Sequence, residues 1–272
     1  MNPLKLALAT AFDVMGINAA MLSLSRSIFR PHVRCVNYHE VAPDQAGAFE
    51  DQLRHYAKHF APVGKQELLA LHEGRWQEDK PGLLITFDDG LRSHVEVAAP
   101  LLEKYGMTGW FMVPAAVVRN APGAKGWEHT VSQETLDFEG LRRLDRNHVI
   151  GCHTFSHRRL EASLTPEEIA WEIPESKRQL EKWLEHPIDV FAWVGGEEWT
   201  YSAAAAQAIR DAGFRISFMT NNALFRPGDN LLQIQRTNIE SDFPPAVARF
   251  GLSGFFDLTY SAKRRRVNRM TA

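Results

Sequence analysis

This sequence of 272 residues has only two cysteines, Cys35 and Cys152. One pair so far apart does not make a disulfide framework, which favours a reducing compartment such as the cytoplasm. The sequence also lacks any apolar run near the roughly 20 residues that span a bilayer, and it lacks a signal-like apolar segment with a small-residue cleavage site. Repeats and low-complexity tracts are absent as well. The length then suits one large α/β domain or two small ones, and we expect one.

Strong net charge is also absent, because 31 basic and 33 acidic residues give a formal charge of −2. The bases gather at the ends: residues 1–34 hold four bases and one acid, and residues 263–272 hold five bases and no acid. The rest keeps 22 bases against 32 acids, which argues against nucleic-acid binding by the fold itself. Basic ends suit an anionic membrane surface, where each base contributes about 1 kcal/mol, and a solubilising tail equally well.

The first thirty residues contain an apolar stripe at helical spacing. Its members are Leu4, Leu8, Phe12, Met15, Ala19 and Leu22. Two alternatives stay open: an amphipathic helix lying on a membrane, or a helix packed on the domain. We therefore expect an N-terminal helix over 1–32, a main domain over 33–245 and a basic tail over 246–272, in a protein that is cytoplasmic or peripheral at the inner face of the membrane.

Strand-like and helix-like segments alternate through most of the chain. The expected strands are 33–38, 83–87, 109–113, 149–153, 190–194, 214–219 and 232–237. The expected helices are 48–60, 65–72, 93–105, 135–146, 165–184 and 202–212. This alternation predicts a parallel sheet, open or closed into a barrel, with its chemistry at the carboxyl ends of the strands.

The strand 83–87 runs directly into Asp88, Asp89 and Gly90. Neighbouring carboxylates repel each other and lose hydration at the mouth of a sheet, so folding alone does not explain the pair. Metal ligation or proton transfer would explain it.

His153 and His157 follow a later strand at a spacing of four. Two such histidines meet one metal ion if the chain between them turns, although the same spacing also occurs on solvated helix surfaces. Two imidazoles and one carboxylate would leave open positions on a divalent ion, as in catalytic sites. The second carboxylate would then serve as general base on a water whose pKa the metal lowers to about 7.

Residues 86–90 (TFDDG) and 153–157 (HTFSH) resemble two motifs of the polysaccharide deacetylases, the NodB-type or family-four carbohydrate esterases. The resemblance covers about residues 33–240. It implies a distorted (β/α)7 barrel, a divalent ion that is usually Zn²⁺, with Co²⁺ or Ni²⁺ as alternatives, and hydrolysis of an N-acetyl group on an amino sugar. By position in the motifs, the general base would be Asp88 and the metal ligands Asp89, His153 and His157.

The third motif of the family is altered here. Residues 191–196 read FAWVGG, whereas the family usually has an aromatic residue, Arg or Ala, and then a Pro-aromatic-Gly turn. The backbone N–H of Gly195 can still donate to an oxyanion, because that role needs no side chain. The family arginine that steadies the base is missing, and Arg236 is the candidate substitute, with a structural arginine as the alternative. Trp193 and Trp199 are candidates for stacking on a sugar, with packing as the alternative.

The late histidine that often serves the family as general acid is also missing, because no histidine follows His186. Residues 36–41 (VNYHEV) resemble the opening of a branch in which the motif order is permuted and a Tyr-His strand end comes first. In that branch the early histidine takes the acid's place, so His39 is the candidate that protonates the leaving amine. A structural histidine is the alternative.

Three other histidines, His55, His59 and His94, are expected on the surface. Cys152 precedes a proposed ligand, and strand alternation points its side chain away from the metal as a small buried residue.

Three functions remain open. The first is a metal-dependent N-deacetylase of a glycan, and the second is a related N-deformylase of a lipid-linked amino sugar. The third is a non-catalytic glycan-binding protein on the same barrel. The expected partners are a glycan or lipid-linked saccharide and, at the periphery, an anionic membrane, with no nucleic acid. Specificity is expected in the loops 120–130 and 195–201.

Overall fold

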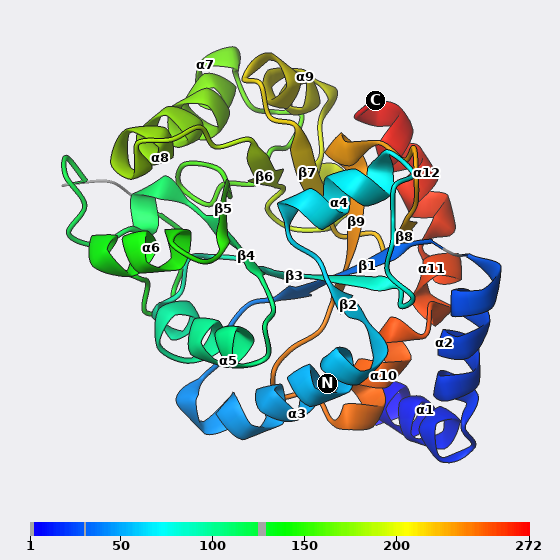
Figure 1. Cartoon of the computed structure of the whole chain (residues 1–272). Coiled ribbons are helices and arrows are strands. Elements are labelled where there is room, and N and C mark those ends of the chain that lie inside the picture. The colour runs from blue at the N-terminus through cyan, green and yellow to red at the C-terminus, as the bar shows by residue number, and fades with distance from the viewer. Residues whose placement is uncertain (1–2, 30, 125–128) are drawn as a thin grey trace.

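The protein is a closed parallel barrel in the computed structural model, which describes residues 3–29, 31–124 and 129–272 (Figure 1). Seven strands follow one another in the order β1-β3-β4-β5-β6-β7-β9, and both β9 and β3 pair with β1, which closes the ring. The strands are β1 Val33–Tyr38, β3 Gly82–Phe87, β4 Gly109–Val113, β5 Val149–Cys152, β6 Val190–Ala192, β7 Ile216–Met219 and β9 Ile234–Asn238. The predicted distorted (β/α)7 barrel is confirmed.

Two short strands extend the sheet outside the ring. β2 Ala61–Pro62 pairs parallel with β3, and β8 Leu224–Phe225 pairs antiparallel with β1. The ring itself is uneven, because β1 and β3 pair along their whole length whereas β5 and β6 share the single pair Cys152 and Phe191. The barrel is therefore firmest where Asp88 and Asp89 follow β3.

The barrel is surrounded by helices close to the expected positions (Figure 1). They are α3 Ala46–His59, α4 Lys65–His72, α5 Ala99–Lys104, α6 Phe138–Asp145, α7 Pro166–Ala170, α8 Ser176–Leu184 and α9 Ala203–Asp211. The expected helix 165–184 is divided by a wider π-type turn, Trp171–Glu175. Pro174 lies in this turn, where its missing N–H removes one helical hydrogen bond. A similar turn, His94–Ala98, precedes Pro100 and α5.

The barrel interior is apolar at the bottom and polar at the top. Leu84, Trp110 and Phe218 belong to a buried cluster inside the ring, where the Trp110 and Phe218 rings meet edge to face at 5.6 Å. Because successive strand residues face opposite sides, the inward positions that follow toward the carboxyl ends are Thr86 and then Asp88. The apolar cluster thus lies directly below a buried polar layer. Cys152 is fully buried, as expected.

The N-terminal segment forms two helices where one was expected, α1 Pro3–Val14 and α2 Ile17–Ile28, separated at Gly16 with φ +70°. α1 packs against α10 Pro245–Leu252 through Phe12, whose ring meets that of Phe250 at 5.5 Å. On this side, the two helices are therefore packed on the domain, which was one of the two predicted alternatives. The side chains of Leu4, Lys5, Arg26 and Arg30 lie outside the described residues. In the part of the chain that the structure describes, no single helix is long and apolar enough to cross a membrane, and only α1 and α2 taken together, bent by 79°, reach that length and composition.

The basic residues expected as a C-terminal tail instead lie in packed helices. Residues 246–272 form α10, α11 Phe255–Thr259 and α12 Ser261–Met270. Val267 of α12 is fully buried, and Arg34 of β1 donates to both carboxylate oxygens of Asp257 at 2.8 Å. α10 buries an apolar face that includes Val247, Phe250 and Leu252, so the segment is anchored by apolar packing that a count of charges does not show.

Candidate active site

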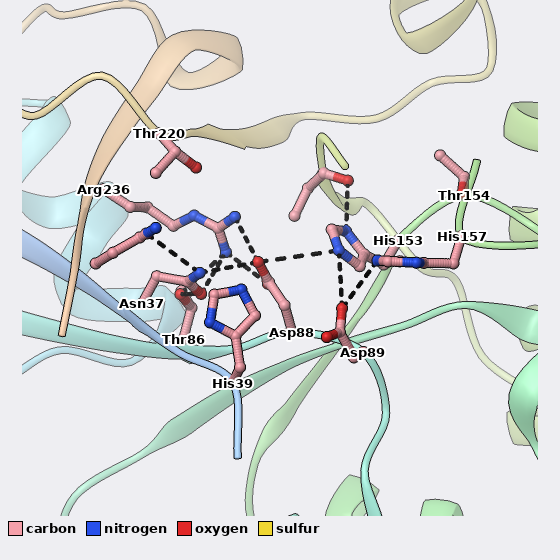
Figure 2. Close-up of polar contacts among 12 residues, drawn as sticks. Asn37, His39, Thr86, Asp88, Asp89, His153, Thr154, His157, Thr220 and Arg236 are labelled. Carbon is pink, nitrogen blue, oxygen red and sulfur yellow. Dashed lines mark hydrogen bonds and ion pairs between the residues drawn. The ribbon is translucent and has the colours of Figure 1, made fainter. Parts of the chain in front are cut away.

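A cavity of about 770 Å³ opens at the carboxyl ends of the barrel strands. The site residues that lie in its lining are Asn37, His39, Asp88, Asp89, His153, His157 and Gly195. Figure 2 shows the polar side chains converging on Asp88 and Asp89. The two motifs and the early Tyr-His strand end therefore meet in one place.

Asp89, His153 and His157 form a compact donor set. The Nε2 atom of His157 lies 3.0 Å from Asp89 Oδ1, and that of His153 lies 3.6 Å from the same oxygen. One ligand atom from each residue lies within 4.8 Å of the others. His153 Nδ1 donates to the Ala192 carbonyl at 2.9 Å, so its Nε2 lone pair faces the set. One carboxylate oxygen and two imidazole nitrogens are ligands that Zn²⁺ accepts with positions left open.

Two members of the donor set and a neighbouring residue lie on strained backbone. Asp89, Thr154 and His157 have φ values of 77°, 60° and 62°, in the left-handed region that residues other than glycine rarely occupy. Each such residue costs on the order of 1–3 kcal/mol unless its surroundings hold it. The Thr130 hydroxyl helps to hold His157 in this conformation, because it lies 3.0 Å from both the Nδ1 atom and the carbonyl oxygen of His157. The strain supports a functional reading of these three positions.

Glu172 holds the loop between the two histidines, and sequence reasoning missed it. This side chain is 3% exposed. It accepts hydrogen bonds from the backbone N–H of Phe155 and of Ser156, each at 2.9 Å, and from the Ser156 hydroxyl at 2.5 Å. A signal was present in the sequence, because Glu172 falls on the apolar stripe of the expected helix, next to Ile169 and Ile173. A carboxylate on a buried helix face requires partners.

Asp88 lies beside the donor set and is held by other partners. The Arg236 guanidinium donates to both carboxylate oxygens of Asp88, at 2.7 and 2.8 Å, and Asn37 Nδ2 donates at 3.0 Å (Figure 2). Both Asp88 and Arg236 are buried. Burial raises the pKa of Asp88, but the charge and hydrogen bonds of Arg236 outweigh it and hold that pKa below its usual value. Asp88 is therefore an ionised carboxylate aimed at the cavity.

His39 lies on the β1 side of the cavity and pairs with Glu240, which sequence reasoning also missed. The His39 Nδ1 and Glu240 Oε1 atoms are 2.9 Å apart. Burial lowers the pKa of His39, but its hydrogen bond to Glu240 and the charges of Asp88, Glu240 and Asp89 outweigh it and raise the pKa to about 9. A histidine with this pKa is protonated at neutral pH, as a general acid must be.

His94 is buried, which corrects the expectation of a surface histidine. Its Nε2–H donates to the His39 carbonyl at 2.7 Å, and its Nδ1 accepts the Leu91 N–H at 3.3 Å. Burial lowers the pKa of His94 to about 4, so the ring is neutral and able to donate and accept at once. The imidazole thus ties the end of β1 to the turn after Gly90. His55 and His59 are half-buried on α3 and lie outside the cavity lining.

The residues after β6 divide between cavity and core. Gly195 lines the cavity with φ +86°. Trp193 is 2% exposed and packs 5.1 Å from the Tyr201 ring, so it offers no face to a sugar and the packing alternative holds. Trp199 is 53% exposed and lies 5.2 Å beneath the guanidinium of Arg159, which lines the cavity.

Two solved structures, one of them of a deacetylase, have the same fold. The Streptococcus pyogenes deacetylase PplD in complex with acetate superimposes with a TM-score of 0.66 at 18% identity, over 82% of this chain and 98% of that one. IcaB from Ammonifex degensii superimposes with a TM-score of 0.65 at 21% identity, over 83% and 98%. At these identities the likeness establishes the fold.

Comparison of sequences gives the family. A Bacillus subtilis protein, YxkH, which carries the name of a polysaccharide deacetylase, is 23% identical over 167 residues. That alignment covers 60% of this chain and about half of the relative, 54%. The sequence model of the polysaccharide deacetylases matches residues 76–217, more than half of the chain and both motifs. The chain belongs to the polysaccharide deacetylase family.

Proposed function

We propose that this protein is a metal-dependent hydrolase that removes the N-acetyl group from an amino sugar of a glycan. The observation that carries the proposal is the separation of two neighbouring carboxylates. Asp89 faces two histidine Nε2 atoms, while Asp88 is turned to Arg236 and Asn37. One carboxylate is thus left for proton transfer beside a site for a divalent ion.

The donor chemistry fits a divalent transition metal, with Zn²⁺ preferred and Co²⁺ or Ni²⁺ as alternatives. Asp89, His153 and His157 would hold it. When bound, such an ion acts as a Lewis acid and lowers the pKa of a coordinated water. The pairing of His153 Nδ1 with the Ala192 carbonyl would fix the tautomer that binding requires.

The protein's own groups would move the protons. Asp88 would take one from the attacking water as the new C–O bond forms on the acetyl carbon. His39, charged and held by Glu240, would give one to the amide nitrogen as the C–N bond breaks. The products are acetate and a free amine. The N–H of Gly195, in the turn that lines the cavity, would donate to the oxygen that gains negative charge.

The outward side of the N-terminal helices supports a lipid-linked or membrane-associated glycan as the substrate, met at the inner face of the membrane. Four large apolar side chains there are 58–83% exposed: Val14, Met15, Leu24 and Ile28. An amphipathic pair of this kind binds an interface through its apolar face. Co-sedimentation with anionic vesicles tests this part, since a protein that stays in the supernatant at low salt contradicts it.

The decisive experiment measures acetate and formate released from N-acetylated and N-formylated amino-sugar oligomers and lipid-linked sugars by Zn²⁺-loaded protein. Acetate release that disappears in the Asp88→Asn variant supports deacetylation, and formate release alone would move the assignment to deformylation. A protein that binds Zn²⁺ and these glycans but releases neither acid would instead be the glycan-binding alternative.

A further inference from the structure

The turn after β6 has little rigidity of its own. Residues 194–196 read Val-Gly-Gly, so no proline fixes φ and two successive glycines have wide backbone freedom. Gly195 nevertheless has a defined φ of +86°, and both glycines line the cavity. A donor to a developing oxyanion must be placed before the reaction begins. Contacts from elsewhere therefore have to hold this turn.

α12 provides two such contacts from one face. Lys263 Nζ donates to the carbonyl oxygen of Gly196. Arg266 forms a two-pronged pair with Glu198, with Nε to Oε1 at 2.8 Å and Nη2 to Oε2 at 2.7 Å. Lys263 and Arg266 are three residues apart on the helix, so their side chains leave the same face. The carbonyl contact and the carboxylate contact bracket the segment 196–198.

α12 also holds the neighbouring loop after β7. Arg264 donates to the carbonyl of Asn221 at 3.1 Å and to that of Asn222. Thr220 precedes these residues and lines the cavity, and its Cβ would lie 3.3 Å from a Cβ placed on Gly196. The two loops are thus packed against each other and fastened to one helix.

We propose that Lys263 and Arg266 are positioning residues that hold the Gly195–Gly196 turn in place for catalysis. The proposal rests on the proposed function of that turn as the oxyanion donor. It assigns a role in the active site to the basic segment that lies outside the region matched to the family, residues 76–217. In this chain a helix distant in sequence replaces the rigidity that a proline would give the turn itself.

The test compares Lys263→Met and Arg266→Met with Arg269→Met. Arg269 is exposed on the same helix and makes no hydrogen bond or ion pair with any described residue, so it matches the loss of charge alone. We expect kcat to fall about tenfold in each of the first two variants, with KM within about twofold, because a loosened oxyanion donor acts on the transition state. Melting temperature and Zn²⁺ stoichiometry should stay at the wild-type values, since one partly exposed hydrogen bond or one exposed ion pair adds little stability.

Charge reversal sharpens the test. Arg266→Glu should have a lower kcat than the wild type. The double variant Arg266→Glu with Glu198→Arg should regain most of the lost kcat, because the ion pair is restored with its charges exchanged. Unchanged kcat in Lys263→Met and Arg266→Met, or an equal loss in Arg269→Met, overturns the proposal.

Hydrogen exchange at the amides of residues 195–198 gives a readout that needs no activity. Lys263→Met should exchange faster there than the wild type and Arg269→Met should not. Equal exchange in all three proteins overturns the proposal. If the wild-type protein releases no acid but Lys263→Met still exchanges faster than the wild type, the proposed function is overturned and the positioning contact stands.

Discussion

The proposed active site has two halves that are built in different ways. The metal half consists of Asp89, His153 and His157, and its two histidines come from one short loop. The acid–base half consists of Asp88 with Arg236, and of His39 with Glu240, which lie about 150 and 200 residues apart in the sequence. β3, β1 and β9 are neighbours in the barrel, so the second half exists only once β9 has closed on β1. A short loop supplies both histidines of the metal half, whereas each pair in the acid–base half joins residues that only closure of the barrel brings together.

The halves are also supported from opposite sides. Glu172 reaches the metal half from the surrounding helices and binds backbone N–H groups, so it acts on the shape of a loop. Arg236 reaches the acid–base half from inside the barrel and binds the carboxylate of Asp88, the proposed base, so it acts on a charge. Substitutions in the two halves should therefore be separable by metal content and pH dependence.

The largest effect is expected from His153→Ala. Loss of one imidazole leaves two protein ligands, and we expect Zn²⁺ content to fall to near zero and acid release to become undetectable. Metal analysis after gel filtration and an acetate assay check this outcome. A variant that keeps stoichiometric Zn²⁺ would remove His153 from the ligand set.

Asp88→Asn should lower kcat by roughly 10²–10⁴-fold, the usual contribution of a general base. Zn²⁺ should remain bound. The buried Arg236 charge loses its counter-charge, so we also expect a loss of stability of about 3–5 kcal/mol, measured by urea unfolding. Loss of metal in the folded variant would show that the two halves are not separate.

Glu172→Gln should weaken the metal half without touching a ligand. A neutral amide accepts less strongly and brings an NH₂ group toward two backbone donors, so the loop should loosen and Zn²⁺ affinity should fall about 10–100-fold. Competition with a chelator measures this. Glu175→Gln is the matched control, because Glu175 lies one turn away and pairs with the exposed Arg178. Equal affinities in both variants would contradict the role of Glu172.

Glu240→Gln should act on the acid–base half alone. Glu240 raises the pKa of His39, so its neutralisation should lower that pKa from about 9 toward the ordinary value. The alkaline limb of the kcat/KM profile should then move to lower pH, with the rate reduced about tenfold at pH 8 and little changed at pH 6, where His39 is protonated in both proteins. An alkaline limb that does not move would exclude His39 as the acid.

Trp199→Ala should have the smallest effect. The exposed indole beside Arg159 can stack on a sugar, and loss of one such contact should raise KM by about threefold to tenfold, following the roughly 0.5–1.5 kcal/mol of an aromatic contact. The kcat value should not change. An unchanged KM for every glycan that the enzyme accepts would make Trp199 a surface residue only.

Sequence reasoning pointed to the candidate metal ligands because they lie in two short motifs at strand ends, and the structure brings these three side chains together. It pointed to Asp88 and His39 as candidates for the same reason, and it offered Arg236 only as one of two readings. It missed Glu240, Asn37 and Glu172, because each of these works through a partner on another element. His94 was expected in solvent because its helix pattern does not show that the first turn faces His39.

The sequence by itself determined the fold class, the family and the candidate site residues, since strand alternation and strand-end motifs are local patterns. Tertiary structure alone decided which charges meet. The predicted basic tail includes Lys263, Arg264 and Arg266, yet in the structure these side chains bind the loops of the active site. Tertiary structure also placed Trp193 in the core and Trp199 at the surface, although both follow β6. Charge and apolarity are properties of a residue, whereas a partner is a property of the packed fold, because it depends on distances that only closure of the barrel sets.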